Sequence, residues 1–166
     1  MAPGRVTALE VVPLGGVGEF GVAAVPGREQ EFAAVFKQAL DYITAIGGCQ
    51  IHCLAGRVPP EQRPAAEATF VRNLTWAADA AREKNVTVLI EPINPRDRPD
   101  YFLTRAEHAA DIIAKVERSN VRIQFDFYHA QIVGGDLVKR LEKHLPWSGM
   151  CRSRLCRRGT NRTKAK

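Results

Sequence analysis

Residues 86–91 read Val-Thr-Val-Leu-Ile-Glu, and residues 121–126 read Val-Arg-Ile-Gln-Phe-Asp. Each stretch is a largely apolar run of strand length that ends in a carboxylate, at Glu91 and at Asp126. Between them, apolar residues at three- and four-residue spacing predict a helix over about 104–116. A strand, a helix and a second strand in succession form the unit that builds a parallel sheet.

Glu91 and Asp126 follow neighbouring predicted strands, at the edge where parallel sheets bind ligands. Two carboxylates that converge there can hold a divalent metal through oxygen ligands. They can instead divide general acid and base work between them. A plainer alternative is that each carboxylate caps a helix or lies in a loop. His129, three residues after Asp126, adds a third polar group to the same edge.

The rest of the chain continues the alternation of strands and helices. The other predicted elements are a possible strand at 8–14, a helix at 29–46, a strand at 49–56, a helix at 65–84 and a short helix at 136–144. Such an alternation favours a parallel α/β sheet in a chain of 166 residues, which is long enough for one domain with its own core. The pattern by itself allows either an open doubly wound sheet or part of a barrel.

The strings at the two strand ends resemble a known family. Residues 90–96, Ile-Glu-Pro-Ile-Asn-Pro-Arg, and residues 124–131, Gln-Phe-Asp-Phe-Tyr-His-Ala-Gln, are similar to the hydroxypyruvate isomerase family over about 18–147. That family belongs to the sugar-isomerase-like TIM barrels, related in fold to xylose isomerase and endonuclease IV. The resemblance implies a partial (β/α)8 TIM barrel of the xylose isomerase-like kind. A full barrel needs about 250 residues, so about half of the barrel is present.

The resemblance also implies a reaction, the interconversion of hydroxypyruvate and tartronate semialdehyde through an enediolate. By position, Glu91 is a catalytic residue and a metal ligand, Asp126 is a metal ligand, and His129 contacts the substrate. The metal implied is Mg²⁺ or Mn²⁺. From the residues themselves, Arg57 lies just past a strand end and can bind a substrate carboxylate with a fork of two hydrogen bonds, or face solvent. His52 either packs in the core or ligates the metal.

These features favour a cytoplasmic isomerase of glyoxylate metabolism, acting on a small hydroxy-keto acid. No apolar run is long enough to cross a membrane, and four cysteines without a zinc-ligand pattern are typical of thiols in a reducing compartment. The alternatives are another sugar isomerase or epimerase, an endonuclease IV-like metal-dependent enzyme, or a nonenzymatic basic binding protein. Nucleic acid is not the expected partner, because residues 1–147 are nearly neutral and the net charge of +6 resides in the C-terminal segment.

We divide the chain into residues 1–17, which we leave unplaced, the partial barrel at 18–147, and a basic tail at 148–166. The resemblance stops at Trp147, and GC-rich codons for the tail, shifted by one base, would spell the strand that the family has next. We therefore interpret the tail as frameshifted and expect it to be disordered. The family's third ligand, a Gln, then falls at Arg152, and its second catalytic Glu falls beyond residue 166. A half barrel also leaves exposed sheet edges, so we expect self-association.

Overall fold

The computed structural model describes residues 9–11 and 19–152, which form one five-stranded parallel sheet with helices. Its strands are β1 Leu9–Val11, β2 Gln50–Cys53, β3 Thr87–Ile90, β4 Val121–Asp126 and β5 Ser148–Arg152. Its helices are α1 Glu29–Ala45, α2 Arg63–Arg82, α3 Ala106–Val116, α4 Phe127–Val133 and α5 Leu137–His144, with short 3-10 helices at Pro60–Gln62 and Leu145–Trp147.

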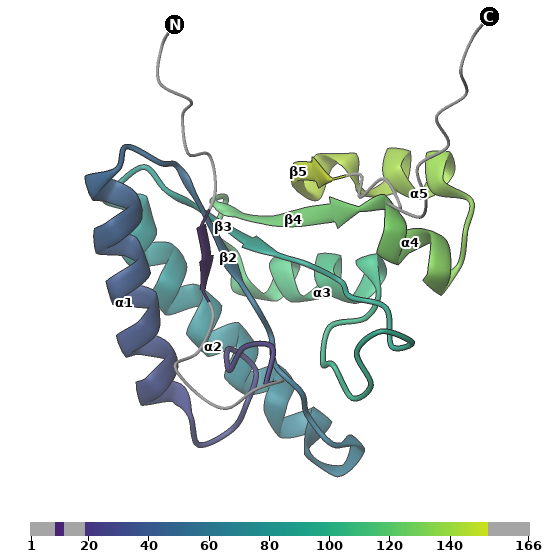
Figure 1. Cartoon of the computed structure of the whole chain (residues 1–166), viewed down its shortest axis with the longest axis horizontal. Coiled ribbons are helices and arrows are strands. Elements are labelled where there is room, and N and C mark those ends of the chain that lie inside the picture. Colours follow the sequence, from purple (N-terminus) through teal and green to yellow (C-terminus); the bar gives the residue numbers. More distant parts are fainter. Residues whose placement is uncertain (1–8, 12–18, 153–166) are drawn as a thin grey trace, which may run out of the picture.

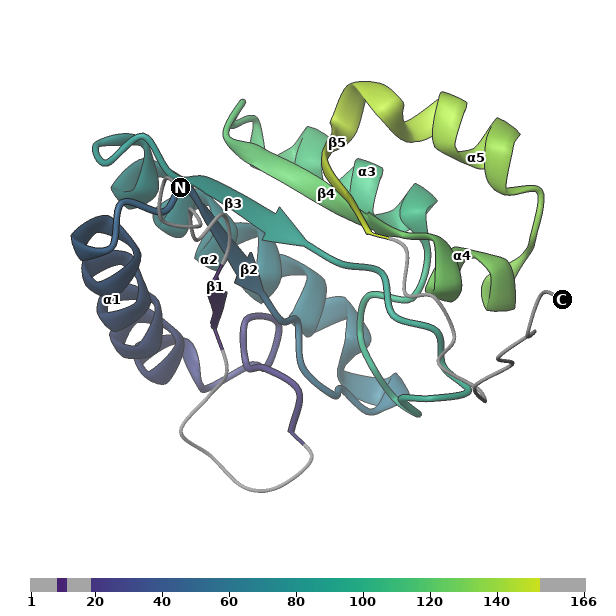
Figure 2. The same ribbon diagram turned by 45° about the horizontal axis from the view of Figure 1, so that its top comes forward.

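The strands are hydrogen-bonded in chain order, β1-β2-β3-β4-β5, and every pair is parallel. An open doubly wound sheet reverses its strand order at a switch point, whereas a barrel adds each strand beside the last. The sequential order therefore confirms the prediction of a partial barrel. The strands fan out in Figure 2, with α1, α2 and α3 along one side of the sheet.

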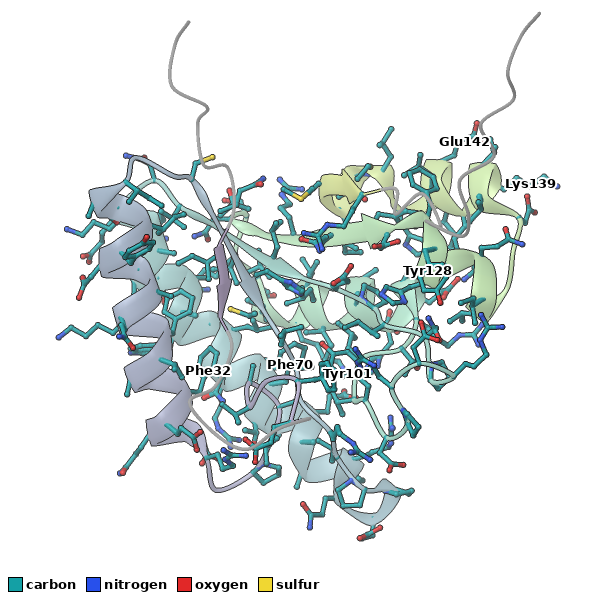
Figure 3. All side chains as sticks on the ribbon, in the orientation of Figure 1. Phe32, Phe70, Tyr101, Tyr128, Lys139 and Glu142 are labelled. Carbon is teal, nitrogen blue, oxygen red and sulfur yellow. The ribbon has the colours of Figure 1, made fainter. Side chains whose placement is uncertain are left out.

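The core lies between these helices and the sheet. α1 packs against β1 and β2, α2 against β3, and α3 against β4 (Figure 1). Each helix turns a stripe of apolar residues inward; in α1 the stripe is Phe32, Val35, Phe36, Ala39, Leu40 and Ile43. Figure 3 labels Phe32 and Phe70, both fully buried aromatic residues of this layer. The apolar core therefore lies on one side of the sheet, and polar groups lie at the carboxyl ends of the strands.

Several helix boundaries differ from those the sequence predicts; α2, for example, begins and ends two residues earlier than expected. α3 begins after Arg105, whose side chain makes no capping hydrogen bond, so the helix starts two residues later than expected. α4 was not predicted at all, because its seven residues are too few to show a helical period. Its first turn is started by Asp126, whose side chain accepts a hydrogen bond from the Tyr128 backbone N–H at 2.8 Å.

The prediction of a disordered tail is wrong for its first five residues, 148–152. We expected these residues to pack against nothing, but they form β5 and pair with β4. Backbone hydrogen bonds hold an edge strand without any alternation of apolar side chains. Gly149 permits the approach, since a Cβ at that position would lie 2.7 Å from the Arg122 Cβ. Residues 153–166 lie outside the described residues, and both the frameshift and the self-association through sheet edges stay predictions.

None of the helices described between residues 19 and 152 has the length and apolar character that crossing a bilayer requires. The residues that follow β2 are bonded to the loops that surround the carboxyl ends of the strands. Ala55 donates its backbone N–H to the hydroxyl of buried Tyr101 at 3.0 Å, and burial raises the pKa of that hydroxyl. Gly21, from the segment before α1, forms an isolated antiparallel bridge with Ala55. These contacts draw three segments together around the carboxyl ends of the strands.

Gly21 offers a test of this close approach, because it has a φ of 97° and a Cβ there would lie 2.1 Å from the Leu54 carbonyl oxygen. Gly47 is the matched control, with a φ of 69° and nothing within 4 Å of an added Cβ. We expect Gly47→Ala to lower the free energy of unfolding by about 1–2 kcal/mol, the cost of the left-handed backbone. Gly21→Ala should cost about 1–3 kcal/mol more through overpacking. Urea titrations would measure both, and equal losses would contradict the packing described for residue 21.

Candidate metal and substrate site

Glu91 and Asp126 lie side by side at the carboxyl ends of β3 and β4. Ile90 pairs with Ile123, so Glu91 is level with Gln124, and Asp126 lies two residues further along the neighbouring strand, on the same face of the sheet. Both carboxylates are buried, at 3% exposure each, and His129 from α4 is buried beside them. One ligand atom from each of these three residues lies within 4.8 Å of the other two. The structure thus brings together three of the four site residues that the sequence singled out.

Glu91 is buried with little to compensate its charge. Its Oε1 accepts no hydrogen bond from the described residues, and its Oε2 lies 3.6 Å from His52 Nε2. Removing a carboxylate from water is unfavourable unless a cation or several hydrogen bonds replace the solvent. Two converging carboxylates supply oxygen donors of the kind that a divalent cation prefers. The residues present therefore fit a metal ion. His52 is buried beside Glu91 and lines the cavity described below, and both of its interpretations stay predictions.

Asp126 both caps α4 and belongs to the carboxylate pair. Its Oδ1 accepts the Tyr128 N–H, which is the capping role that the plainer alternative proposed. A carboxylate has two oxygens with several lone pairs, so capping through one oxygen leaves the other able to contact a ligand. The two interpretations of Asp126 are therefore compatible, and the cap fixes the orientation of its side chain.

Asn94 determines which ring nitrogen of His129 carries the proton. The Asn94 backbone N–H, which can only donate, points at His129 Nδ1 at 3.4 Å, and Asn94 Nδ2 lies 2.7 Å from the same nitrogen. The amide is oriented by Asp97, whose N–H donates to Asn94 Oδ1 at 2.9 Å. Nδ1 is therefore an acceptor, and neutral His129 carries its proton on Nε2. His129 can then donate a hydrogen bond to a ligand.

Asp97 ties the loop after β3 to α4. Tyr128, labelled in Figure 3, donates its hydroxyl to Asp97 Oδ2 at 2.7 Å, and Asn94 Nδ2 donates to the same oxygen at 3.1 Å. The hydroxyl of Tyr128, with the Asn94 amide, holds the pKa of Asp97 below its ordinary value, and the same bond raises the pKa of Tyr128. Sequence reasoning missed the roles of these three residues. The signal available was that all three lie in or beside the two strings that resemble the isomerase family.

A cavity of about 190 Å³ opens over Glu91 and His129, and Asp126 lines a second pocket that also contacts His129. The lining of the cavity comes from the ends of β2 and β3, the loops that follow them and the start of α4: Phe20, His52, Leu54, Glu91, Ile93, Asp97, Arg98, Tyr128 and His129.

The sequence offers two roles for Arg57, substrate binding or a solvent-facing side chain, and Arg57 is absent from that lining. Its backbone forms a bridge with Tyr101, and its guanidinium points to the neighbouring loop. There its Nε donates to the Pro99 carbonyl at 3.1 Å, and its Nη2 lies 3.4 Å from Asp100 Oδ2. The side chain is about half exposed. The arginine that does line the cavity is Arg98.

Comparisons with known proteins agree with this geometry. The family model described as "Xylose isomerase-like TIM barrel" matches residues 5–151. The 2-oxo-tetronate isomerase of Cupriavidus necator is 45% identical over 133 residues, which are 80% of this chain and 51% of that protein. The hydroxypyruvate isomerase of Escherichia coli is 38% identical over 125 residues, 75% of this chain and 48% of that protein. The chain spans about half the length of the curated relatives it matches.

A solved structure named AP endonuclease, family 2, from Brucella melitensis superposes with a TM-score of 0.85 and 36% identity. The alignment covers 89% of this chain and 57% of that one. The structural match therefore covers as much of this chain as the sequence matches do.

The protonation state of His129 can be measured directly. In chain labelled with ¹⁵N-histidine and kept free of metal, at a pH where the imidazole is neutral, the nitrogen shifts should show the proton on Nε2. Asn94→Ala removes one of the two donors that face Nδ1, so the other tautomer should become populated. The signals of His108, which contacts Phe102 and Glu67 instead, should not move. A proton on Nδ1 in the unsubstituted chain would contradict the geometry.

Proposed function

The chain belongs to the xylose isomerase-like TIM barrel family, and from this premise we propose that it carries part of the active site of a hydroxypyruvate isomerase-type enzyme. The reaction interconverts hydroxypyruvate and tartronate semialdehyde. A proton leaves C3 of hydroxypyruvate, an enediolate forms across C2 and C3, and a proton returns to C2 while the hydroxyl hydrogen moves between the two oxygens. The observation that carries the proposal is the buried convergence of Glu91, Asp126 and His129 in a chain related to two isomerases.

In this proposal Glu91 and Asp126 hold Mg²⁺ or Mn²⁺. Hard oxygen ligands suit these ions, and the buried Glu91 oxygen without a hydrogen bond from the described residues supports a cation at this position. When bound, such an ion supplies Lewis-acid stabilisation of the charge that develops on the two substrate oxygens.

The residues of the chain do the rest of the work. Glu91 takes or returns the proton, since a carboxylate buried at the strand end can reach a substrate held in the cavity. His129 donates its Nε2 proton in a hydrogen bond to a substrate oxygen, which Asn94 makes possible by occupying Nδ1. Asp97 and Tyr128 keep the loop and α4 at a constant separation, and so hold the wall of the cavity.

A second substrate is favoured by one specific comparison. The Cupriavidus necator relative, 45% identical, is named for 2-oxo-tetronate. That molecule has one carbon more than hydroxypyruvate and also places a carbonyl beside a carboxylate, so the same groups could act on it. With either substrate, the proposal is a cytoplasmic isomerase of small hydroxy-keto acids, with hydroxypyruvate placing it in glyoxylate metabolism.

The position of Arg152 supports weak metal binding by this chain. It lies opposite Asp126 in the pairing of β4 and β5, at the position where the family resemblance expects a Gln ligand. A guanidinium beside a carboxylate competes with a divalent cation for the same charge. We therefore propose that the chain by itself is weakly active or inactive.

Manganese binding tests the ligand assignment. We expect weak binding of Mn²⁺ by the 166-residue chain, with Glu91→Gln and Asp126→Asn each weakening it by at least about tenfold. Arg152→Gln should strengthen binding by roughly tenfold, because it removes a competing charge and restores a neutral oxygen donor. Asp79→Asn is the matched control, an exposed carboxylate paired with Arg118. Calorimetry would measure all five proteins. Equal affinities for the parent and both carboxylate variants would overturn the assignment.

The activity itself is tested by transplanting the site. Residues 19–147 of this chain would replace the matching segment of the Cupriavidus necator isomerase, and the chimera would be assayed on hydroxypyruvate and on 2-oxo-tetronate. We expect metal-dependent isomerisation by the chimera and at most a trace from the 166-residue chain. Glu91→Gln in the chimera should lower the rate by two or more powers of ten. A folded chimera that isomerises neither acid would refute the proposed function.

A further inference from the structure

Phe20 and Arg98 form a stacked pair on the wall of the cavity. The Arg98 guanidinium carbon lies 3.8 Å from the centroid of the Phe20 ring, well within the range of a cation–π contact. Both residues line the cavity that contains Glu91 and His129. Phe20 adopts a φ of 51°, a left-handed conformation that is unfavourable for a bulky side chain. Such strain persists only where surrounding contacts enforce it, and it is concentrated at functional sites.

The strained conformation of Phe20 is enforced by contacts of its two sequence neighbours, and Arg98 is held separately. Glu19, the residue before Phe20, receives two hydrogen bonds from Arg28 at 2.9 and 3.0 Å. Gly21, the residue after it, is pressed against Leu54 at the end of β2. Arg98 is positioned by its own loop, because its backbone N–H donates to the Asn94 carbonyl at 3.2 Å. The ring and the guanidinium are therefore brought together by separate, independently anchored segments.

Most of the hydrogen-bonding capacity of Arg98 is unused. Nη1 donates to the Asp97 carbonyl at 2.9 Å, while Nε and Nη2 donate to no atom of residues 19–152. Arg28 shows the contrast, since its guanidinium is taken up by Glu19 and Glu31. A guanidinium stacked on an aromatic face keeps its N–H edge available for a partner in the ring-parallel plane, and a carboxylate matches that edge with two oxygens.

We propose that Arg98, stacked on Phe20, binds the carboxylate of the substrate and selects acids over neutral hydroxy ketones. The identity of the acid rests on the function proposed above. Glu91 and Asp97 make the cavity acidic, so an anionic substrate needs a fixed cation there as well as any metal. Arg98 fills the role that the sequence predicted for Arg57, whose guanidinium is engaged by Pro99 and Asp100 outside the cavity.

The test uses a matched pair of ligands and a matched pair of arginines. Hydroxypyruvate and dihydroxyacetone differ only in a carboxylate against a hydroxymethyl group. Their binding to the 166-residue chain would be measured by calorimetry in the presence of Mg²⁺, together with Arg98→Gln, Arg98→Lys and the control Arg57→Gln. We expect Arg98→Gln to weaken hydroxypyruvate binding about 10- to 100-fold and to leave dihydroxyacetone binding unchanged. Arg98→Lys keeps the positive charge but loses the two-pronged hydrogen bonding, so its affinity for hydroxypyruvate should lie between those of the parent and Arg98→Gln. Arg57→Gln should change the binding of neither ligand.

Several outcomes would overturn the proposal. They are undetectable binding of hydroxypyruvate by the parent chain, equal weakening of both ligands in Arg98→Gln, or an equal effect of Arg57→Gln. Far-ultraviolet circular dichroism would verify that each variant is folded, and Arg98→Lys supplies the answer if Arg98→Gln is not. Failure of the proposed function looks different. A chimera that binds hydroxypyruvate through Arg98 without isomerising it leaves this inference standing, whereas an Arg98→Gln chimera with an unchanged KM for hydroxypyruvate refutes this inference alone.

Discussion

Two carboxylates buried beside each other are the constraint on which the arrangement of this molecule depends. Glu91 and Asp126 follow adjacent parallel strands whose register places them on one face, and one ligand atom of each lies within 4.8 Å of the other. Like charges at this spacing repel, and burial removes the water that would screen them. The fold must therefore supply compensation from dipoles and donors or from a bound cation. Helix α4 begins at Asp126 and supplies one such donor, the Tyr128 backbone N–H.

The surrounding polar groups are organised as a support for that pair. Asn94 and Asp97, on the loop after β3, orient His129 and accept the hydroxyl of Tyr128, so one loop and one helix are joined by a short chain of hydrogen bonds. Satisfied networks of this kind hold a site rigidly, because each member fixes the orientation of the next. The same loop also holds Arg98, whose backbone N–H donates to the Asn94 carbonyl, while Phe20 comes from the segment before α1. A cavity lined by both acidic and cationic side chains is suited to a ligand that has both oxygen donors and a carboxylate.

The parts of this structure that could be predicted are those set by local pattern. The apolar runs before Glu91 and Asp126 are typical of buried strands, and alternation with amphipathic helices requires a parallel sheet, which places both carboxylates at one edge. What could not be predicted depends on contacts between distant segments. Val58 donates its backbone N–H to the Asp100 carbonyl and Arg57 bridges Tyr101, which turns Arg57 away from the cavity and leaves Arg98 inside it. Likewise β5 is held by backbone pairing with β4, which its side-chain pattern does not reveal.

The stability of the Glu91→Gln variant tests the central claim most directly. If the buried pair is held together against its own repulsion, then neutralising Glu91 should relieve that repulsion. In chelator, the free energy of unfolding measured in urea should be equal to or higher than that of the parent chain. Mn²⁺ at a concentration that saturates the parent should stabilise the parent more than the variant, because the stabilisation by a ligand grows with its affinity for the folded protein. A variant that is less stable in chelator, and that gains as much stability from Mn²⁺ as the parent, would contradict the account.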